Sequence, residues 1–205
     1  MDTQQIIIAF VGLAFIILIG LGVWYFARRK TTERLRERFG PEYDKTVSTH
    51  HSQQSAEADL SKREERVRKF NIVSLPQGER VRYKENWLLV QSRFVDRPDS
   101  ALADANSLVQ EVMHRCGYPV TDFEQSAADI SVNHPQVVEN FRAACRIAER
   151  NKRSAASTEE LRQALIHYRA LFDDLLQSEE TDVRSTESER MPTRNGKSSR
   201  VQPNH

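Results

Sequence analysis

The chain has 205 residues, a formal net charge of +1 and two cysteines. The balanced charge, and the lack of basic runs interleaved with aromatic residues, argue against nucleic-acid binding. Two cysteines are too few for the disulfide framework of a small secreted domain.

An apolar segment near the N-terminus is the strongest feature of the sequence. Residues 6–27 carry no charged side chain, follow a short flank (1–5) and precede a basic run. Crossing about 30 Å of hydrocarbon takes roughly 20 apolar residues in a helix, and this segment is long enough. The alternative, a cleaved signal peptide, would need a basic flank before the apolar run and a small-x-small cleavage site after it. Neither is found, so the sequence predicts a retained transmembrane helix.

Basic residues gather on only one side of this predicted helix. They are Arg28, Arg29, Lys30, Arg34, Arg36 and Arg38. The positive-inside rule therefore predicts that the N-terminus lies outside and that the body of the protein lies in the cytoplasm. The same six residues form a candidate lipid-facing patch, because each well-placed cation near an anionic bilayer contributes about 1 kcal/mol of attraction. The alternative is that they do no more than set the topology.

A basic juxtamembrane helix and connector are expected over 28–52. The first part should continue the membrane helix to Phe39, and Gly40-Pro41 should end it. Residues 42–52 are then expected to form a polar connector.

A helical domain is expected over 53–178, with about five amphipathic helices and no strand-like alternation. The first helix, 53–69, is polar and has one narrow stripe formed by Leu60 and Val67. These two residues are one heptad apart, and a coiled coil needs three or four heptads. We therefore expect a helix that faces solvent.

The next predicted helix, 77–95, has apolar residues on two sides. One stripe consists of Val81, Leu88 and Val95, and the other consists of Tyr83, Trp87, Val90 and Phe94. A helix of this kind either lies at the centre of a bundle or is covered by a partner. Central burial is our expectation, and a partner is the alternative.

Three further long helices and a short one are expected, each with a single apolar face. Asp99 is a candidate cap for the first, which ends before Gly117, and the short helix covers 122–129. Pro135 is expected at the first position of the next helix. The last helix should begin with a capping box formed by Ser157-Thr158-Glu159-Glu160. The predicted core residues of the long helices are Leu102, Ala105, Leu108, Val109, Val112, Met113, Cys116, Val137, Val138, Phe141, Ala144, Cys145, Ala148, Leu161, Ala164, Leu165, Tyr168, Leu171, Phe172 and Leu175.

Both cysteines, Cys116 and Cys145, fall on apolar helix faces, which predicts packed and reduced thiols. A disulfide between them is the alternative if the body lies outside the cytoplasm. Residues 179–205 contain only three aliphatic side chains and cannot bury enough apolar surface to offset the entropy of ordering. They are predicted to form a disordered tail.

No catalytic, cofactor-binding or metal-ligating residue can be assigned from the sequence. The chain has no glycine-rich phosphate loop, and its only close histidine pair, His50-His51, has no third ligand nearby. An enzymatic site would have to form in the fold, for example if His134 and His167 met acidic residues in one pocket.

Three stretches of the chain carry a resemblance: RFGPEYD at 38–44, the segment 117–142 and HYRALFDDLL at 167–176. They resemble a widespread group of uncharacterised bacterial proteins that join one N-terminal membrane helix to a helical domain. The resemblance covers most of residues 34–176. It implies a bacterial origin, a single-pass anchor in the inner (cytoplasmic) membrane and an all-α body, and it supplies no catalytic residue.

The sequence therefore predicts an all-α protein with a transmembrane helix, a bundle of about five amphipathic helices and a disordered tail. The leading hypothesis is a non-enzymatic interaction or scaffold module that binds the lipid bilayer and a protein partner, with no nucleic acid and no cofactor. One alternative is a membrane-tethered enzyme or regulatory subunit whose site forms only in the fold. The other is a sensor of anionic lipid surfaces that acts through the basic juxtamembrane segment.

Overall fold

The computed structural model describes residues 3–153 and 156–177, without the side chains of residues 3–15, 17, 23 and 24. This part of the chain contains eight helices and no strand, which confirms the all-α class. The helices are α1 (Thr3–Phe39), α2 (Pro41–Thr49), α3 (Gln53–Val67), α4 (Gln77–Phe94), α5 (Pro98–Arg115), α6 (Phe123–Ile130), α7 (Val138–Asn151) and α8 (Thr158–Gln177). The tail predicted over 179–205 lies outside the described residues.

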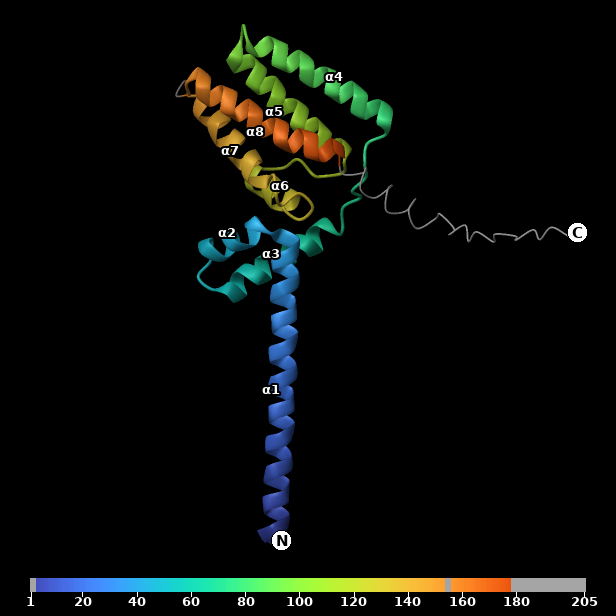
Figure 1. Cartoon of the computed structure of the whole chain (residues 1–205), viewed down its shortest axis with the longest axis vertical. Coiled ribbons are helices and arrows are strands. Elements are labelled where there is room, and N and C mark those ends of the chain that lie inside the picture. The colour runs from blue at the N-terminus through green and yellow to red at the C-terminus, as the bar shows by residue number, and fades with distance from the viewer. Residues whose placement is uncertain (1–2, 154–155, 178–205) are drawn as a thin grey trace, which may run out of the picture.

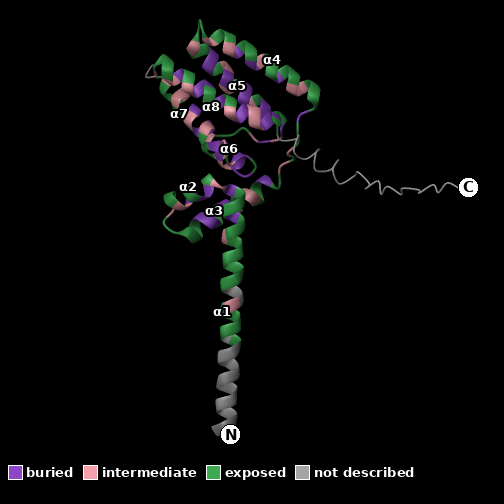
Figure 2. Ribbon diagram, viewed as in Figure 1, coloured by how far each residue is buried: buried purple, intermediate pink, exposed green. Residues whose placement is uncertain are grey.

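Helix α1 is a long rod that extends away from the rest of the molecule (Figure 1). Its last turns are packed, and the side chains of Leu35 and Phe39 are fully buried. Farther from the packed end, the large apolar side chains that the structure describes are exposed (Figure 2). They are Ile16, Leu18, Ile19, Leu21, Tyr25 and Phe26.

Among the described residues, no helix combines enough length with enough apolar character to cross a membrane. The transmembrane helix predicted over 6–27 lies partly outside those residues, because the side chains of 6–15, 17, 23 and 24 are not described.

Helices α2 and α3 pack around the C-terminal end of α1, and the three together form a small unit that we call the base (Figure 1). The end of α1 at Phe39 is confirmed. The chain then turns at Gly40, whose φ of +46° lies in the left-handed region that glycine adopts readily. A separate apolar core lies in the base, formed by Leu35, Phe39, Tyr43, Leu60 and Val67 together with Val132 from the turn after α6.

The polar connector predicted over 42–52 is wrong for most of its length, because α2 occupies it. Pro41 lies in the first turn of α2, where the N–H that proline lacks would have no partner in any case. Glu42 and Asp44 add negative charge near the same helix N-terminus. A short polar helix gains most of its stability from packing, which the burial of Tyr43 in the base provides.

Helices α4 to α8 form the bundle, which lies beyond the base (Figure 1). Helix α5 packs against α4, α7 and α8, and α8 packs against α5 and α7, so α5 and α8 are central. The apolar faces predicted for α5, α7 and α8 are confirmed, since all their predicted core residues lie in the main core or pack against it. The capping box is confirmed too: the N–H of Ser157 donates to Glu160 Oε2 at 2.8 Å, and the N–H of Glu160 donates to Ser157 Oγ at 3.3 Å.

The central position predicted for α4 is wrong. One stripe of α4 is buried, and Trp87 stacks on Phe172 of α8 with ring centroids 4.7 Å apart. The other stripe is not buried, since Val81, Leu88 and Val95 are 50%, 64% and 84% exposed. Helix α4 lies on the outside of the bundle (Figure 1), because α5 and α8 already fill the centre.

Two helix starts also differ from the predicted ones. Helix α5 begins at Pro98, and its N-cap is Arg97 instead of Asp99. Helix α7 begins at Val138, and Pro135 lies in the preceding turn. A turn accepts the fixed φ of proline as readily as the first turn of a helix does, so proline alone could not distinguish the two.

Candidate functional site

The base and the bundle meet at a set of charged side chains that we call the joint. Its centre is Glu42 of α2, whose side chain is 1% exposed. Arg142 of α7 donates two hydrogen bonds to this carboxylate, from Nη1 to Oε2 at 2.6 Å and from Nη2 to Oε1 at 2.8 Å. Arg63 of α3 donates a third hydrogen bond, to Oε1 at 2.7 Å. One carboxylate therefore holds α2, α3 and α7 together.

The charges of the joint stabilise one another. Burial by itself would raise the pKa of the Glu42 carboxyl, but hydrogen bonds and positive charge from Arg142 and Arg63 hold the pKa below its ordinary value. Burial also disfavours the charged form of Arg142, yet its contacts with Glu42 and Glu139 raise its pKa. A buried ion pair is tolerated only while both partners are in place. The joint thus fixes the position of α7 relative to the base.

A second ion pair joins the base to α6. Arg66 of α3 lies 3.1 Å from Oδ1 of Asp129, whose side chain is 1% exposed. Gln125, one turn earlier on α6, donates to the same oxygen at 2.8 Å. Burial raises the pKa of Asp129 more than these two partners lower it. Just after α6, the hydroxyl of Ser131 accepts a hydrogen bond from Arg63 at 3.3 Å, which links this ion pair to the joint.

The turn that follows α6 is held against α8. His134 is 8% exposed, and its Nδ1 forms a short hydrogen bond with Oδ2 of Asp174. Asn133 Nδ2 donates to the Tyr118 hydroxyl at 2.8 Å. The rings of Tyr118 and His134 meet edge to face, with centroids 5.9 Å apart. These contacts extend the polar connection from the base into the bundle.

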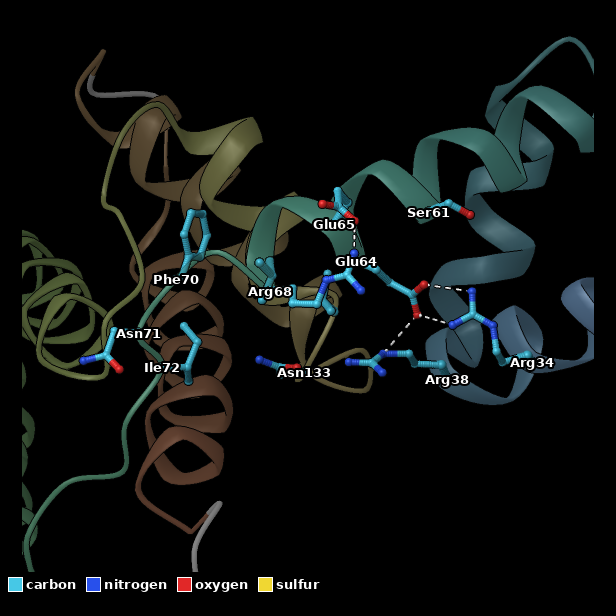
Figure 3. Close-up of a pocket in the computed structure, with 12 residues that line it drawn as sticks. Arg34, Arg38, Ser61, Glu64, Glu65, Arg68, Phe70, Asn71, Ile72 and Asn133 are labelled. Carbon is cyan, nitrogen blue, oxygen red and sulfur yellow. Dashed lines mark hydrogen bonds and ion pairs between the residues drawn. The ribbon is translucent and has the colours of Figure 1, made fainter.

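A cleft of about 580 Å³ opens where α1 and α3 meet the turn after α6 (Figure 3). Arg34 and Arg38 of α1 both point at Glu64 of α3. Glu64 accepts hydrogen bonds from Arg34 at 3.2 and 2.9 Å and lies 3.2 Å from Nε of Arg38. Arg68 pairs with its own neighbour on α3, Glu65. The three arginines of the cleft thus share two glutamates, and the two ion pairs of Glu64 hold α1 to α3.

The six basic residues of the predicted lipid-facing patch do not form one free cluster. Four of them form ion pairs within the molecule: Arg29 with Glu33, Arg36 with Asp44, and Arg34 and Arg38 with Glu64. The positive charge of Arg28 helps to lower the pKa of the buried Glu57 carboxyl, and Lys30 is exposed. Internal ion pairs thus reduce the positive charge that is left for a lipid surface.

The structure does not gather the histidines into one site. His134 binds Asp174, whereas Nδ1 of His167 lies 3.0 Å from Oδ1 of Asn140. His167 and Asp174 are two turns apart on α8, or about 10 Å along its axis. Within the described residues, no group of three or more His, Cys, Asp or Glu side chains is placed to hold a metal ion.

Both cysteines are free thiols, as predicted. Burial raises the pKa of Cys116 and of Cys145 to about 11, so neither is a thiolate near neutral pH. Cys145 lines a cavity of about 250 Å³, where its Sγ lies 3.4 Å from the Tyr168 hydroxyl. A protonated thiol in such surroundings is a packing group and lacks the activation that a nucleophile needs.

Sequence analysis did not find the joint. A usable signal was the placement of Arg142 directly after Phe141, at the edge of the apolar face of α7. A charged side chain that is carried into a core must find a partner there. The partner is Glu42, 100 residues away, and only the fold brings the two together.

Protein-family models, the curated proteins and the solved structures were compared with the chain, and none of them gives a match. The resemblance to the bacterial group therefore stays a prediction. Two of the stretches that carry it, 38–44 and 117–142, contribute Glu42 and Arg142 to the joint.

Proposed function

We propose that the protein is a membrane-anchored, non-enzymatic helical module that presents its bundle to a protein partner at a fixed height and orientation on the cytoplasmic side of the bilayer. One observation carries this proposal. Helix α1 continues without a break from its exposed apolar part into the core of the base, where Leu35 and Phe39 are fully buried. The exposed apolar part of α1 and the base are therefore one continuous helical unit with no linker between them.

The described part of α1 supports the anchor. At 100° per residue, Ile16, Leu18, Ile19, Leu21 and Phe26 point to most sides of the helix, and each of them is more than half exposed. An isolated helix that is apolar on all sides is stable in apolar surroundings, which a bilayer supplies. The basic residues that follow favour a cytoplasmic body.

The contacts of the base and the joint support a fixed orientation. Twelve residues separate Ala27, the end of the expected span, from Phe39 in the core of the base, which places that core about 18 Å along the helix from the bilayer. The clamp of Arg34 and Arg38 on Glu64 holds α3 to α1. The Glu42–Arg142 pair then holds the bundle to the base. A flexible tether would need none of these contacts.

The two alternatives have less support. An enzyme would need convergent titratable groups in a cavity, and His134 and His167 bind different partners two turns apart on α8. A lipid sensor would need free cations, and four of the six basic residues are paired within the molecule.

Topology in intact cells tests this proposal. Full-length protein with Cys116→Ala and Cys145→Ser would carry one new cysteine, at Thr3 in one variant and at Arg146 on the exposed side of α7 in the other. A membrane-impermeant thiol reagent should label Thr3→Cys in spheroplasts and label Arg146→Cys only after lysis. Recovery of the protein in the soluble fraction, or the reverse labelling pattern, would refute the anchored and cytoplasmic arrangement.

A further inference from the structure

The outer face of α4 gathers exposed apolar side chains. Outside α1, seven large apolar residues of the described chain are exposed, and four of them lie on α4 or at its C-cap: Val81, Leu88, Leu89 and Val95. The other three, Val73, Val120 and Ile166, are separated along the chain. Single exposed apolar residues are ordinary, but a group of them on one face marks an interaction surface.

The spacing of this group suits a second helix. Val81, Leu88 and Val95 recur every seven residues, so they form a nearly straight stripe of about 21 Å along α4. Leu89 lies beside the stripe and borders a groove of about 230 Å³ between α4 and α5. An amphipathic helix whose apolar residues recur at the same interval could lie along this stripe.

The charge around the stripe indicates which kind of helix would bind. Among residues 79–85, Arg80, Arg82 and Lys84 stand against two carboxylates, Glu79 and Glu85. Glu79 already pairs with Arg115 and is also acted on by the charge of Arg82, and within the described residues neither Arg80 nor Lys84 forms an ion pair. Arg93, farther along α4, does form one, with Asp104 at 3.1 Å. A second copy of this face would bring the same surplus of positive charge against it, whereas an acidic helix would neutralise the surplus.

We infer that this outer face of α4 docks an amphipathic helix of a protein partner, with apolar residues that cover Val81, Leu88 and Val95 and with acidic residues beside Arg80 and Lys84. The inference rests on the proposed function, because it names the chemistry of the partner that the bundle presents itself to. The two apolar stripes of α4 left two interpretations, a central helix or a helix covered by a partner. The exposed stripe favours the second.

Photo-cross-linking in the native membrane tests the inference on the full chain. A photoreactive phenylalanine analogue at Leu88 is compared with the same analogue at Ile166, a lone exposed apolar residue on α8, and at Ile147 on α7. Cross-linked peptides are then identified by mass spectrometry. We expect Leu88, and not Ile166, to capture one segment of another protein that has heptad-spaced apolar residues and acidic neighbours.

Charge reversal gives the second readout. Arg80→Glu with Lys84→Glu should reduce the Leu88 cross-link about 10-fold, which corresponds to about 1.4 kcal/mol. Lys62→Glu on the exposed side of α3 is the matched control and should leave the yield unchanged. Both variants should stay in the membrane fraction.

Several results would overturn the inference. They are a Leu88 cross-link to a second copy of this chain, to its own residues 178–205 or to lipid alone, no cross-link at all, and a cross-link that charge reversal does not weaken. If the protein remains in the membrane and Ile147 captures a partner while Leu88 does not, the docking face is wrong and the proposed function stands. If the protein is not in the membrane, the proposed function fails.

Discussion

Glu42 and Arg142 lie 100 residues apart in the chain and face each other as a doubly hydrogen-bonded ion pair at 2.6 and 2.8 Å. Glu42 belongs to the base and Arg142 to the bundle, and both side chains are at least nine-tenths buried. Apolar contacts alone allow helices to slide or rotate over one another. A buried pair that needs both partners in one geometry restricts such movement. This pair is thus one of the contacts that would hold the bundle in a fixed orientation on the base.

Removal of Arg142 should destabilise the protein strongly. Arg142→Met keeps much of the side-chain volume but leaves the Glu42 carboxylate with Arg63 as its only arginine partner, and breaking a buried pair in this way costs about 3–5 kcal/mol. The measurement is urea unfolding of full-length protein in detergent with Trp24→Phe, so that Trp87 alone reports on the bundle. Arg162→Met is the control, because Arg162 and Glu159 form a solvent-exposed pair whose loss should change stability little. Equal losses in the two variants would refute a special role for the joint.

The joint should weaken in acid. The pKa of Glu42 is lower in the folded protein than its ordinary value of 4.5, so its contribution to stability is present above pH 4.5 and is lost as the pH falls through the folded pKa. Glu42→Gln should therefore be less stable than the parent protein near neutral pH, and the difference should shrink below pH 4.5. The contribution of Asp129 to stability changes with pH in the opposite direction, since its raised pKa favours the folded state at low pH. If the difference in stability between Glu42→Gln and the parent protein were the same at every pH, the charge of Glu42 would not contribute to stability.

Two glycines should respond in opposite ways to alanine. Gly117 has a φ of +92°, and a Cβ there would overlap the backbone carbonyl of Asn71. Gly117→Ala should cost about 3 kcal/mol, from the left-handed backbone and from overpacking. Gly78, in the first turn of α4, has open space around it, so Gly78→Ala should raise stability by about 0.4–1 kcal/mol. Thermal unfolding of both variants in the same detergent measures the contrast, and a neutral Gly117→Ala would contradict the close backbone approach.

Substitution of two neighbouring residues on α4 should change stability by very different amounts, because one residue is buried and the next is exposed. Trp87 is 3% exposed and Leu88 is 64% exposed. Trp87→Ala should cost about 3–5 kcal/mol, whereas Leu88→Ser should stay within about 0.5 kcal/mol of the parent protein. Urea unfolding followed by circular dichroism reports on both variants, since it does not depend on Trp87. A large loss of stability in Leu88→Ser would show that Leu88 is buried, which would agree with the central position predicted for α4 from the sequence.

The spacing of apolar residues correctly predicted those helices that pack a single apolar face against the core. The faces of α5 and α8 and the capping box of Ser157 and Glu160 are of this kind, and all are confirmed. Prediction failed for the connector over 42–52 and for the helix start at Pro135, because proline suits a turn and a first helical turn alike. It also failed for α4, since a sequence shows two apolar stripes but does not show which helices compete for the centre.

The joint could not be predicted because its contacts depend on the tertiary structure. Arg142 lies at the edge of an apolar face, but Glu42 and Arg63 are ordinary polar positions when each helix is considered alone. Their burial follows from the way that α2 and α3 fold back against α6 and α7, and α2 itself was expected to be a connector. Ion pairs between segments far apart in the chain have no local sequence pattern.

The distance between α1 and the bundle in a lipid bilayer tests the central claim most directly. Spin labels at Lys30→Cys and Arg146→Cys, with Cys116→Ala and Cys145→Ser, would be measured by pulsed electron paramagnetic resonance on full-length protein in nanodiscs. A rigid module predicts one narrow distance distribution, which broadens when Arg142→Met breaks the joint. A broad distribution in the protein with an intact joint would show that the bundle is tethered loosely, and it would contradict the fixed presentation proposed here.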